Sequence, residues 1–256
     1  MLKNISLDDK YKLENKFILV NGTQALVRAT LIQKFRDEKE NLKTAGFVTG
    51  YRGSPVGNVD LQFTKVKKLI SEKDIKFHPG LNEDIAATSL WGSQQAEMRG
   101  ESNYDGVFGF WYGKGPGVDR SGDVFRHSNL AGTSKNGGVI AAMGDDHSGE
   151  SSTVLFQSEY AFKDAMIPIL SPSGVQELID YSILGWALSR YAGVWVGLKC
   201  LKDTIDATEV VDGSPDKLKI IYPENPVKRG ELSIRVGDTP HAQEERLHRQ
   251  KLPAVK

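Results

Sequence analysis

The sequence predicts an α/β protein with a doubly wound, mainly parallel sheet and helices on both faces. Two observations support this fold class. Short apolar runs alternate with longer segments that carry apolar residues at helical spacing, and most of the runs end in glycine- or proline-rich loops. Alternating strands and helices form parallel sheets that are covered on both sides. A chain of 256 residues, 39% of them hydrophobic, is long enough for one such domain with an extension.

The apolar runs have the length of strands, and the segments between them have the length of helices. In chain order the expected strands are 17–20, 45–49, 75–78, 105–112, 138–143, 166–170 and 194–198, with 218–222 as the candidate for a last one. The expected helices are 23–35, 59–72, the segment that begins near Glu83, and 173–191, with a charged helix-like segment at 241–251. Ser173 is the expected N-cap of its helix.

Composition excludes several classes of protein. The formal net charge is +0, so the sequence has no electrostatic footprint for nucleic acid or an anionic membrane. Cys200 is the only cysteine, which excludes an intrachain disulfide and an iron–sulfur cluster held by this chain, and its apolar surroundings predict a buried thiol. Neither a signal peptide nor a membrane-spanning run is visible, and we expect a cytoplasmic protein.

The loops that follow four of the strands, near Gly50, Pro79, Gly113 and Gly144, should share one edge of the sheet. In doubly wound sheets that edge binds the ligand. The loop at 50–57 is as rich in glycine as a phosphate cradle, but it lacks the Lys-Ser/Thr end of a P-loop and could equally be a tight turn. The segment at 113–118 is too rich in glycine to predict a helix or a strand.

Glu83 occupies the point where a strand gives way to a helix. The run at 75–78 ends at Pro79-Gly80, and the Ala-rich segment beyond Glu83 has helical spacing. A carboxylate in the first helical turn is favoured by the exposed N–H groups there. The residues alone therefore allow either a helix-capping acid or a functional carboxylate.

Other polar groups give weaker signals. Asp119, Asp123 and His127 recur every four residues, which suits a solvated helix face better than a metal site. The loop 145–148 joins acids, His and Ser, but the Gly-x-Ser-x-Gly elbow of a hydrolase is absent, and His147 is read as bonding its own turn. Core packing explains the tryptophans, which are Trp91, Trp111, Trp186 and Trp195.

Four segments carry a resemblance to a known family. They are TGYRGSP at 49–55, NED at 82–84, YGKGPGVDRSGD at 112–123 and GDDH at 144–147. Together they resemble the N-terminal domain of the thiamine diphosphate-dependent 2-oxoacid:ferredoxin oxidoreductases, most closely the large single-chain indolepyruvate type of bacteria. The similarity runs from about Leu7 to the end of the chain and includes 241–247.

The resemblance implies a thiamine diphosphate-binding fold of the pyrimidine type. In that family the cofactor lies between two related domains, one holding the aminopyrimidine ring and the other the diphosphate through a metal ion. By this resemblance Glu83 is the catalytic glutamate that hydrogen-bonds the pyrimidine nitrogen. The further residues implied at the cofactor are Gly53, Ser54 and Pro55, and those implied at the substrate are Arg52, Ser54 and Lys114.

The sequence lacks a Gly-Asp-Gly string for a metal–diphosphate site and a cysteine-rich segment, and no metal ligand is assigned within it. The resemblance therefore places Mg²⁺, the diphosphate half of the site and the iron–sulfur clusters outside these residues. We expect 1–206 to be the pyrimidine-binding domain, 207–256 to be an extension toward absent domains, and the isolated piece to be inactive.

The implied reaction is oxidative decarboxylation of an aryl-2-oxoacid such as indolepyruvate to an acyl-CoA. Coenzyme A and ferredoxin take part through the whole enzyme, which the family suggests is a homodimer. Two alternatives stay open at this stage. One is a non-oxidative thiamine diphosphate decarboxylase or synthase, and the other is a non-catalytic scaffold with the same fold.

Overall fold

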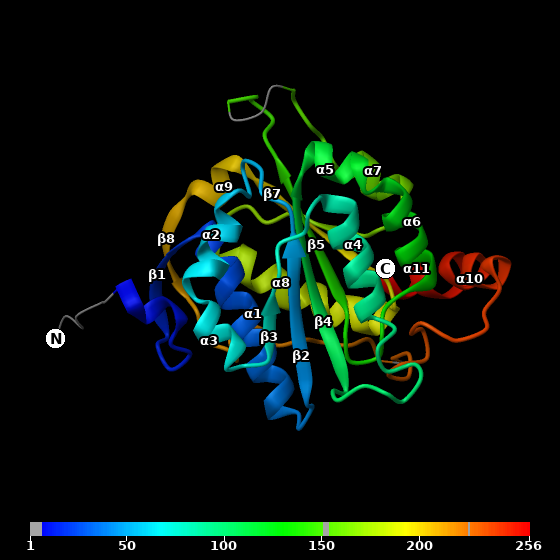
Figure 1. The fold of residues 1–256 in the computed structure, drawn as a ribbon. Coiled ribbons are helices and arrows are strands. Elements are labelled where there is room, and N and C mark those ends of the chain that lie inside the picture. Colours follow the sequence, from blue (N-terminus) through cyan, green and yellow to red (C-terminus); the bar gives the residue numbers. More distant parts are fainter. Residues whose placement is uncertain (1–6, 151–153, 225) are drawn as a thin grey trace.

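The computed structural model describes residues 7–150, 154–224 and 226–256, and these form a six-stranded sheet with two layers of helices. The strand order is β3-β2-β4-β5-β7-β6, and every pair in it is parallel (Figure 1). The strands are β2 (Thr44–Gly50), β3 (Ile75–Phe77), β4 (Gly106–Lys114), β5 (Val139–Asp145), β6 (Ile169–Leu170) and β7 (Val196–Leu201). The predicted doubly wound α/β fold is confirmed.

Helices cover both faces of the sheet (Figure 1). One apolar core joins the sheet to α1 (Gly22–Lys39), α2 (Asn58–Lys65), α3 (Lys67–Ser71) and α8 (Val175–Ala192). The other joins it to α4 (Glu83–Ser93), α5 (Gly115–Arg120), α6 (Gly122–Ala131) and α7 (Glu159–Asp164). The central strand β4 shows the period-2 alternation that this layering requires, because Phe110 and Tyr112 enter the first core and Trp111 enters the second.

The first predicted strand exists but lies outside the main sheet. β1 (Phe17–Asn21) pairs in antiparallel register with β8 (Thr208–Asp212), forming a separate two-stranded sheet. The prediction of a strand at 218–222 is wrong, because this segment is irregular. Its chain instead follows α1, where Arg36 Nη1 donates to the carbonyls of Pro215 and Leu218 at 3.0 and 2.9 Å.

Three local expectations are also corrected. The segment at 113–118 is regular, since β4 runs to Lys114 and α5 begins at Gly115, with Pro116 in the first helical turn where it loses no hydrogen bond. The helix expected at 59–72 is divided at Val66 into α2 and α3. Ser173 is not the N-cap of α8; Gly174 is, and the Ser173 hydroxyl bonds Glu177 at 2.9 Å.

The C-terminal part packs beside the end of α8. After α9 (Lys202–Asp206), the chain returns to α10 (Pro240–Arg246), a π-helical turn (Leu247–Lys251) and α11 (Leu252–Val255). Leu247 packs with Ala192 and Val194 in a small third cluster. The thiol of Cys200 is buried as expected, and so are three of the four tryptophans, Trp91 being half-buried. Among the described residues, none of the helices combines the length and apolar character needed to cross a membrane.

Candidate functional site

The four predicted loops do gather at the carboxyl edge of the sheet, at the top of Figure 1. Parallel neighbours end on the same side, so the loops after β2, β3, β4 and β5 are adjacent. Backbone hydrogen bonds tie them together: Tyr51 N donates to Tyr112 O at 3.0 Å, and Gly80 N donates to Gly50 O at 2.8 Å. This edge contains most of the side chains singled out by the sequence.

Glu83 is the first residue of α4, and it is only 8% exposed. Asn82 caps the helix, its side-chain oxygen accepting from Ile85 N at 2.9 Å. The carbonyl oxygen of Glu83 accepts from Trp111 Nε1 at 3.0 Å, which fixes the start of α4 against β4. Because Asn82 performs the capping, the Glu83 side chain is left for another role.

The carboxylate of Glu83 faces the first turn of α5. A Cβ atom on Gly117 would lie 2.4 Å from Glu83 Cγ and 2.7 Å from its Oε1, so a glycine is required for this approach. No described residue donates a hydrogen bond to the carboxylate. Its oxygens are not among the fully buried polar atoms of the described chain that lack a partner, so they can be reached from outside. A largely buried carboxylate without a donor is suited to accept a hydrogen bond from a group outside the chain.

Arg120 and Asp84 form the charged rim beside this carboxylate. Arg120 Nε lies 2.6 Å from Asp84 Oδ1. The bond to Asp84 raises the pKa of Arg120, and the charge of Glu83 adds to the effect. The same bond holds the pKa of Asp84 below its usual range. Arg120 and Asp84 pair with each other at the surface, whereas the neighbouring Glu83 is largely buried.

Lys114 and the 51–55 loop meet on the other side of β4. Lys114 is half-buried, and its aliphatic stem crosses Gly53, where an added Cβ would lie 2.7 Å from Lys114 Cδ. Ser54 is exposed and Pro55 is buried, with a cis peptide bond between them. A Cβ on Gly144 would lie 3.2 Å from Pro55 Cδ. The loop is therefore in contact with both β4 and β5.

Arg52 has a different environment from the other predicted residues. Its exposed guanidinium acts electrostatically on Asp60 in α2, whose carboxylate also accepts the Tyr112 hydroxyl. Burial raises the pKa of Asp60, while the Tyr112 bond and the Arg52 charge oppose that rise. Burial raises the pKa of Tyr112 as well, and Asp60 adds to it. In the described chain, Arg52 is associated with this pair and not with Glu83.

The 145–148 loop is anchored by residues that the sequence reasoning missed. Asp145 is buried and accepts from Ser158 N at 2.9 Å and Ser158 Oγ at 2.5 Å. Burial raises the pKa of Asp145, and the Ser158 bonds oppose the rise. Ligand atoms of Asp145, His147 and Glu159 lie within 4.8 Å of one another. Lys199 Nζ, 2.8 Å from Glu159 Oε1, already supplies a positive charge there.

Two further expectations concern His147 and the polar helix face. The turn at 146–149 is held by Asp146, whose Oδ1 accepts from Ser148 Oγ and Gly149 N, whereas His147 makes no hydrogen bond to another described residue. The lysine at 199 could have been noticed as a charge inside an apolar strand run, whereas Ser158 and Glu159 carry no sequence signal. The expected polar face of Asp119, Asp123 and His127 is exposed to solvent, and it is divided between α5 and α6.

Comparison with models of protein families and with curated proteins finds no match. Among solved structures, the chain is similar to a 2-oxoglutarate:ferredoxin oxidoreductase from Magnetococcus marinus, which was solved with 2-oxoglutarate, coenzyme A and succinyl-CoA bound. The TM-score is 0.65 at 14% sequence identity, over 94% of this chain and 45% of that chain. The two share the α/β fold, and this chain spans less than half the length of the protein it matches.

Proposed function

We propose that this chain is the pyrimidine-binding half of a thiamine diphosphate site in a 2-oxoacid:ferredoxin oxidoreductase of the indolepyruvate type. The sequence segments 49–55, 82–84, 112–123 and 144–147 support this family, and the fold is shared with an oxidoreductase that acts on 2-oxoglutarate. The observation that carries the proposal is the buried Glu83 carboxylate, which has no donor among the described residues and faces a glycine.

The residues at this edge fit an aminopyrimidine ring. Glu83 would share a proton with a ring nitrogen, because a carboxylate held by its helix start is a fixed acceptor. Gly117 lets the carboxylate pack directly against α5, where any side chain would displace it. Gly53, Ser54 and Pro55 would form the neighbouring wall. When bound, thiamine diphosphate supplies a carbon nucleophile for the oxo group of a 2-oxoacid.

The same edge offers groups for the substrate. The stem of Lys114 packs on Gly53, the residue before the exposed Ser54, so a lysine and a serine belong to the same part of the edge. A 2-oxoacid presents a carboxylate and a carbonyl oxygen, which these two groups can bind. We place Lys114 before Arg52 as the partner of the carboxylate, because Asp60 already attracts the Arg52 guanidinium.

A second body should complete the site. Leu81 and Ile85, on either side of Glu83, are 85% and 46% exposed, and Leu155 from the neighbouring loop is 60% exposed. Exposed apolar side chains around one edge are characteristic of a surface that another domain covers. The diphosphate half, with Mg²⁺, the iron–sulfur clusters and the contacts to coenzyme A and ferredoxin, would come from that body, and a homodimer would bring the two together.

Replacement of Glu83 by Gln in the full-length enzyme tests this function. The amide keeps the size but removes the acceptor charge, so turnover of indolepyruvate should fall by about 100-fold or more. The matched control is Asp84→Asn, which alters the adjacent acid that pairs with Arg120 at the surface. Equal turnover in wild type and Glu83→Gln would favour the scaffold alternative over an enzyme.

Product analysis separates the two enzymatic alternatives. The proposed reaction yields an acyl-CoA and reduces ferredoxin, whereas a non-oxidative decarboxylase releases an aldehyde and reduces nothing. Aldehyde formation without ferredoxin reduction would replace the oxidoreductase proposal with the decarboxylase one.

A further inference from the structure

A cavity lies at the edge of the sheet opposite the candidate site. It has a volume of about 430 Å³ and is lined by residues of α1 and α8 and by Ile220, Tyr222, Pro226, Val227 and Arg229. Both helices end just before a strand begins, α1 before β2 and α8 before β7, so the cavity lies at the amino ends of the strands. Sites for small molecules have volumes of about 300–1,000 Å³, and this one is in that range.

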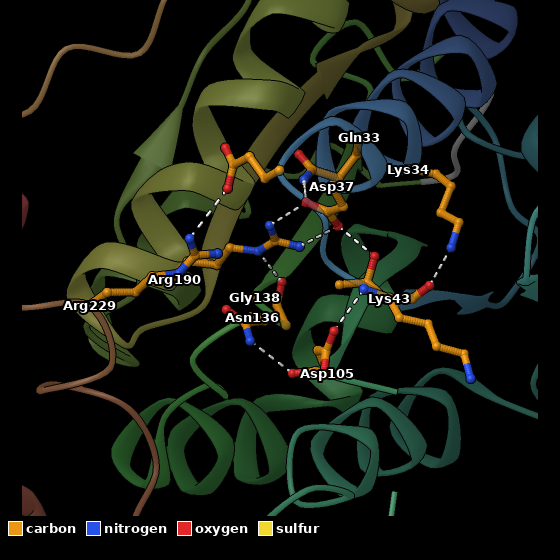
Figure 2. Close-up of polar contacts among 12 residues, drawn as sticks. Gln33, Lys34, Asp37, Lys43, Asp105, Asn136, Gly138, Arg190 and Arg229 are labelled. Atoms are coloured by element: carbon orange, nitrogen blue, oxygen red, sulfur yellow. Dashed lines mark hydrogen bonds and ion pairs between the residues drawn. The ribbon is translucent and has the colours of Figure 1, made fainter. Parts of the chain in front are cut away.

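The inner wall of the cavity is an ion pair whose charges are already satisfied. Arg190 donates to both carboxylate oxygens of Asp37, at 2.6 and 2.9 Å, as Figure 2 shows. Asp37 also accepts from Gln33 Nε2 at 2.8 Å and from Thr44 Oγ1 at 2.7 Å. Arg190 Nε donates to the carbonyl of Gly137. This pair therefore contributes structure and shape but no net charge.

Two other guanidinium groups of the lining keep free donors. Arg36 uses Nη1 for carbonyls in the segment 215–218, and no described residue accepts from its Nε or Nη2. Arg229 makes one contact in the described chain, from Nη1 to Glu40 Oε2 at 3.3 Å. With the inner pair neutral, two arginines face one glutamate. The cavity thus carries one net positive charge and several unused N–H groups.

The remaining walls are apolar and aromatic. Ile183 and Ile220 contribute aliphatic surface, and the rings of Tyr191 and Tyr222 lie 5.5 Å apart between their centroids. The Tyr191 hydroxyl accepts from Val227 N at 3.0 Å, so its own proton is available to an acceptor in the cavity. The unused groups of Arg36, Arg229 and Tyr191 are thus donors beside an apolar and aromatic surface.

We propose that this cavity binds a small organic anion. Its acidic group, a carboxylate, sulfonate or phosphate, would lie between Arg36 and Arg229 and displace Glu40 from the weak contact with Arg229. Guanidinium groups bind such oxyanions through paired N–H donors. Its apolar body would pack on Tyr191 and Ile183. The site belongs to residues outside the carboxyl edge and is independent of the role proposed for Glu83.

Fluorescence titration with 8-anilinonaphthalene-1-sulfonate tests the proposal in the full-length protein. N-phenyl-1-naphthylamine, the same ring system without the sulfonate, reports on binding without charge. We expect Arg229→Gln and Arg36→Gln each to lower the affinity for the sulfonate probe by about tenfold, because each substitution removes a charge-assisted contact. The neutral probe should change by less than about twofold. Lys228→Gln, an exposed neighbour outside the lining, is the matched control.

Arg229 is the decisive position, because its exposed side chain makes only the Glu40 contact in the described chain and can be replaced without loss of the fold. Equal affinity of the sulfonate probe for wild type and Arg229→Gln would overturn the proposal. An equal loss for the charged and the neutral probe would overturn it too, since that result would show a general change in the apolar surface.

Discussion

The α-carbon of Gly117 lies so close to the Glu83 side chain that a methyl group there would be 2.4 Å from Glu83 Cγ. Carbon atoms that are not bonded do not approach within 3.0 Å, so any side chain at 117 must displace the glutamate or α5. The glycine-rich start of α5 and the acidic start of α4, which are separated in the sequence, therefore pack closely against each other at the carboxyl edge. This contact gives a way to move Glu83 without changing its chemistry.

Gly117→Ala should reduce turnover of the full-length enzyme by about 100-fold, the scale at which small displacements of catalytic groups act. The carboxylate remains present but is shifted from its acceptor position. Steady-state turnover checks this, with circular dichroism to show that the variant is folded. The matched control is Gly92→Ala in the same helix as Glu83, because nothing lies within 4 Å of a Cβ there. Turnover near the wild-type level would show that the Gly117 contact does not position the glutamate.

Gly92→Ala has its own expected effect on stability. Gly92 lies inside α4, where glycine costs about 0.5–1 kcal/mol relative to alanine, and the added methyl group meets open space. The free energy of unfolding should increase by about that amount in urea titrations. A decrease would mean that the α4 backbone at this position does not tolerate a side chain.

Apolar patterning predicted much of the fold, because a strand buried on both faces is a short apolar run between loops. The same signal could not show which strand Phe17–Asn21 would pair with. Its alternation of exposed and buried residues, with Phe17 and Leu19 exposed, belongs to a strand covered on one side only. The strand expected at 218–222 fails because Arg36 takes carbonyls of this region, a long-range contact that no local pattern shows.

The candidate site was predictable where it depends on topology and not where it depends on side-chain partners. The position of Glu83 at a strand-to-helix junction follows from the pattern around Pro79. The regular structure of 113–118 was not predicted, because glycine frequency indicates a loop, whereas here Gly117 allows α5 to pack on Glu83. The influence of the Arg52 charge on Asp60 depends on α2 folding back beside β4, where Asp60 also accepts from the Tyr112 hydroxyl.

Breaking the ion pair between Asp37 and Arg190 should cost about 3–5 kcal/mol of unfolding free energy. Arg190→Met leaves a buried carboxylate, 1% exposed, without its charge partner. Chemical denaturation measures the loss. The control is Lys39→Gln, which breaks the exposed pair with Asp216 and should cost less than about 1 kcal/mol. The double variant Asp37→Leu/Arg190→Met should lose less than the sum of the single ones, and strict additivity would contradict the coupling.

Cys200 should be unreactive in the folded protein. Burial raises the pKa of its thiol, the nearby charge of Asp145 adds to the rise, and the side chain is 0% exposed. A thiol that is neither accessible nor ionised does not attack disulfide reagents. At pH 8, Ellman's reagent should modify this cysteine only after denaturant is added. Prompt modification of the native protein at position 200 would show that β7 opens readily.

Lys251 is a buried amine that should make stability depend on alkaline pH. Its Nζ lies 3.3 Å from the carbonyl of Ala131, and the side chain is 0% exposed. Burial lowers its pKa to about 7, with Arg246 adding to the decrease. The other charged groups that act on it are Asp238, which opposes the decrease, and Arg235, which adds to it.

The sign of the pH effect follows from the difference between folded and unfolded states. In the unfolded chain this lysine has a pKa of about 10.4, so between pH 7 and about 10 the unfolded state binds the proton and the folded state does not. Between these pH values the unfolding free energy of wild type should therefore rise relative to that of Lys251→Met. Below pH 7 the difference in unfolding free energy between the two proteins should not change with pH. Urea titrations at several pH values measure this, with the exposed Lys256→Met as control. Parallel profiles for wild type and Lys251→Met would show that the amine stays charged in the folded protein.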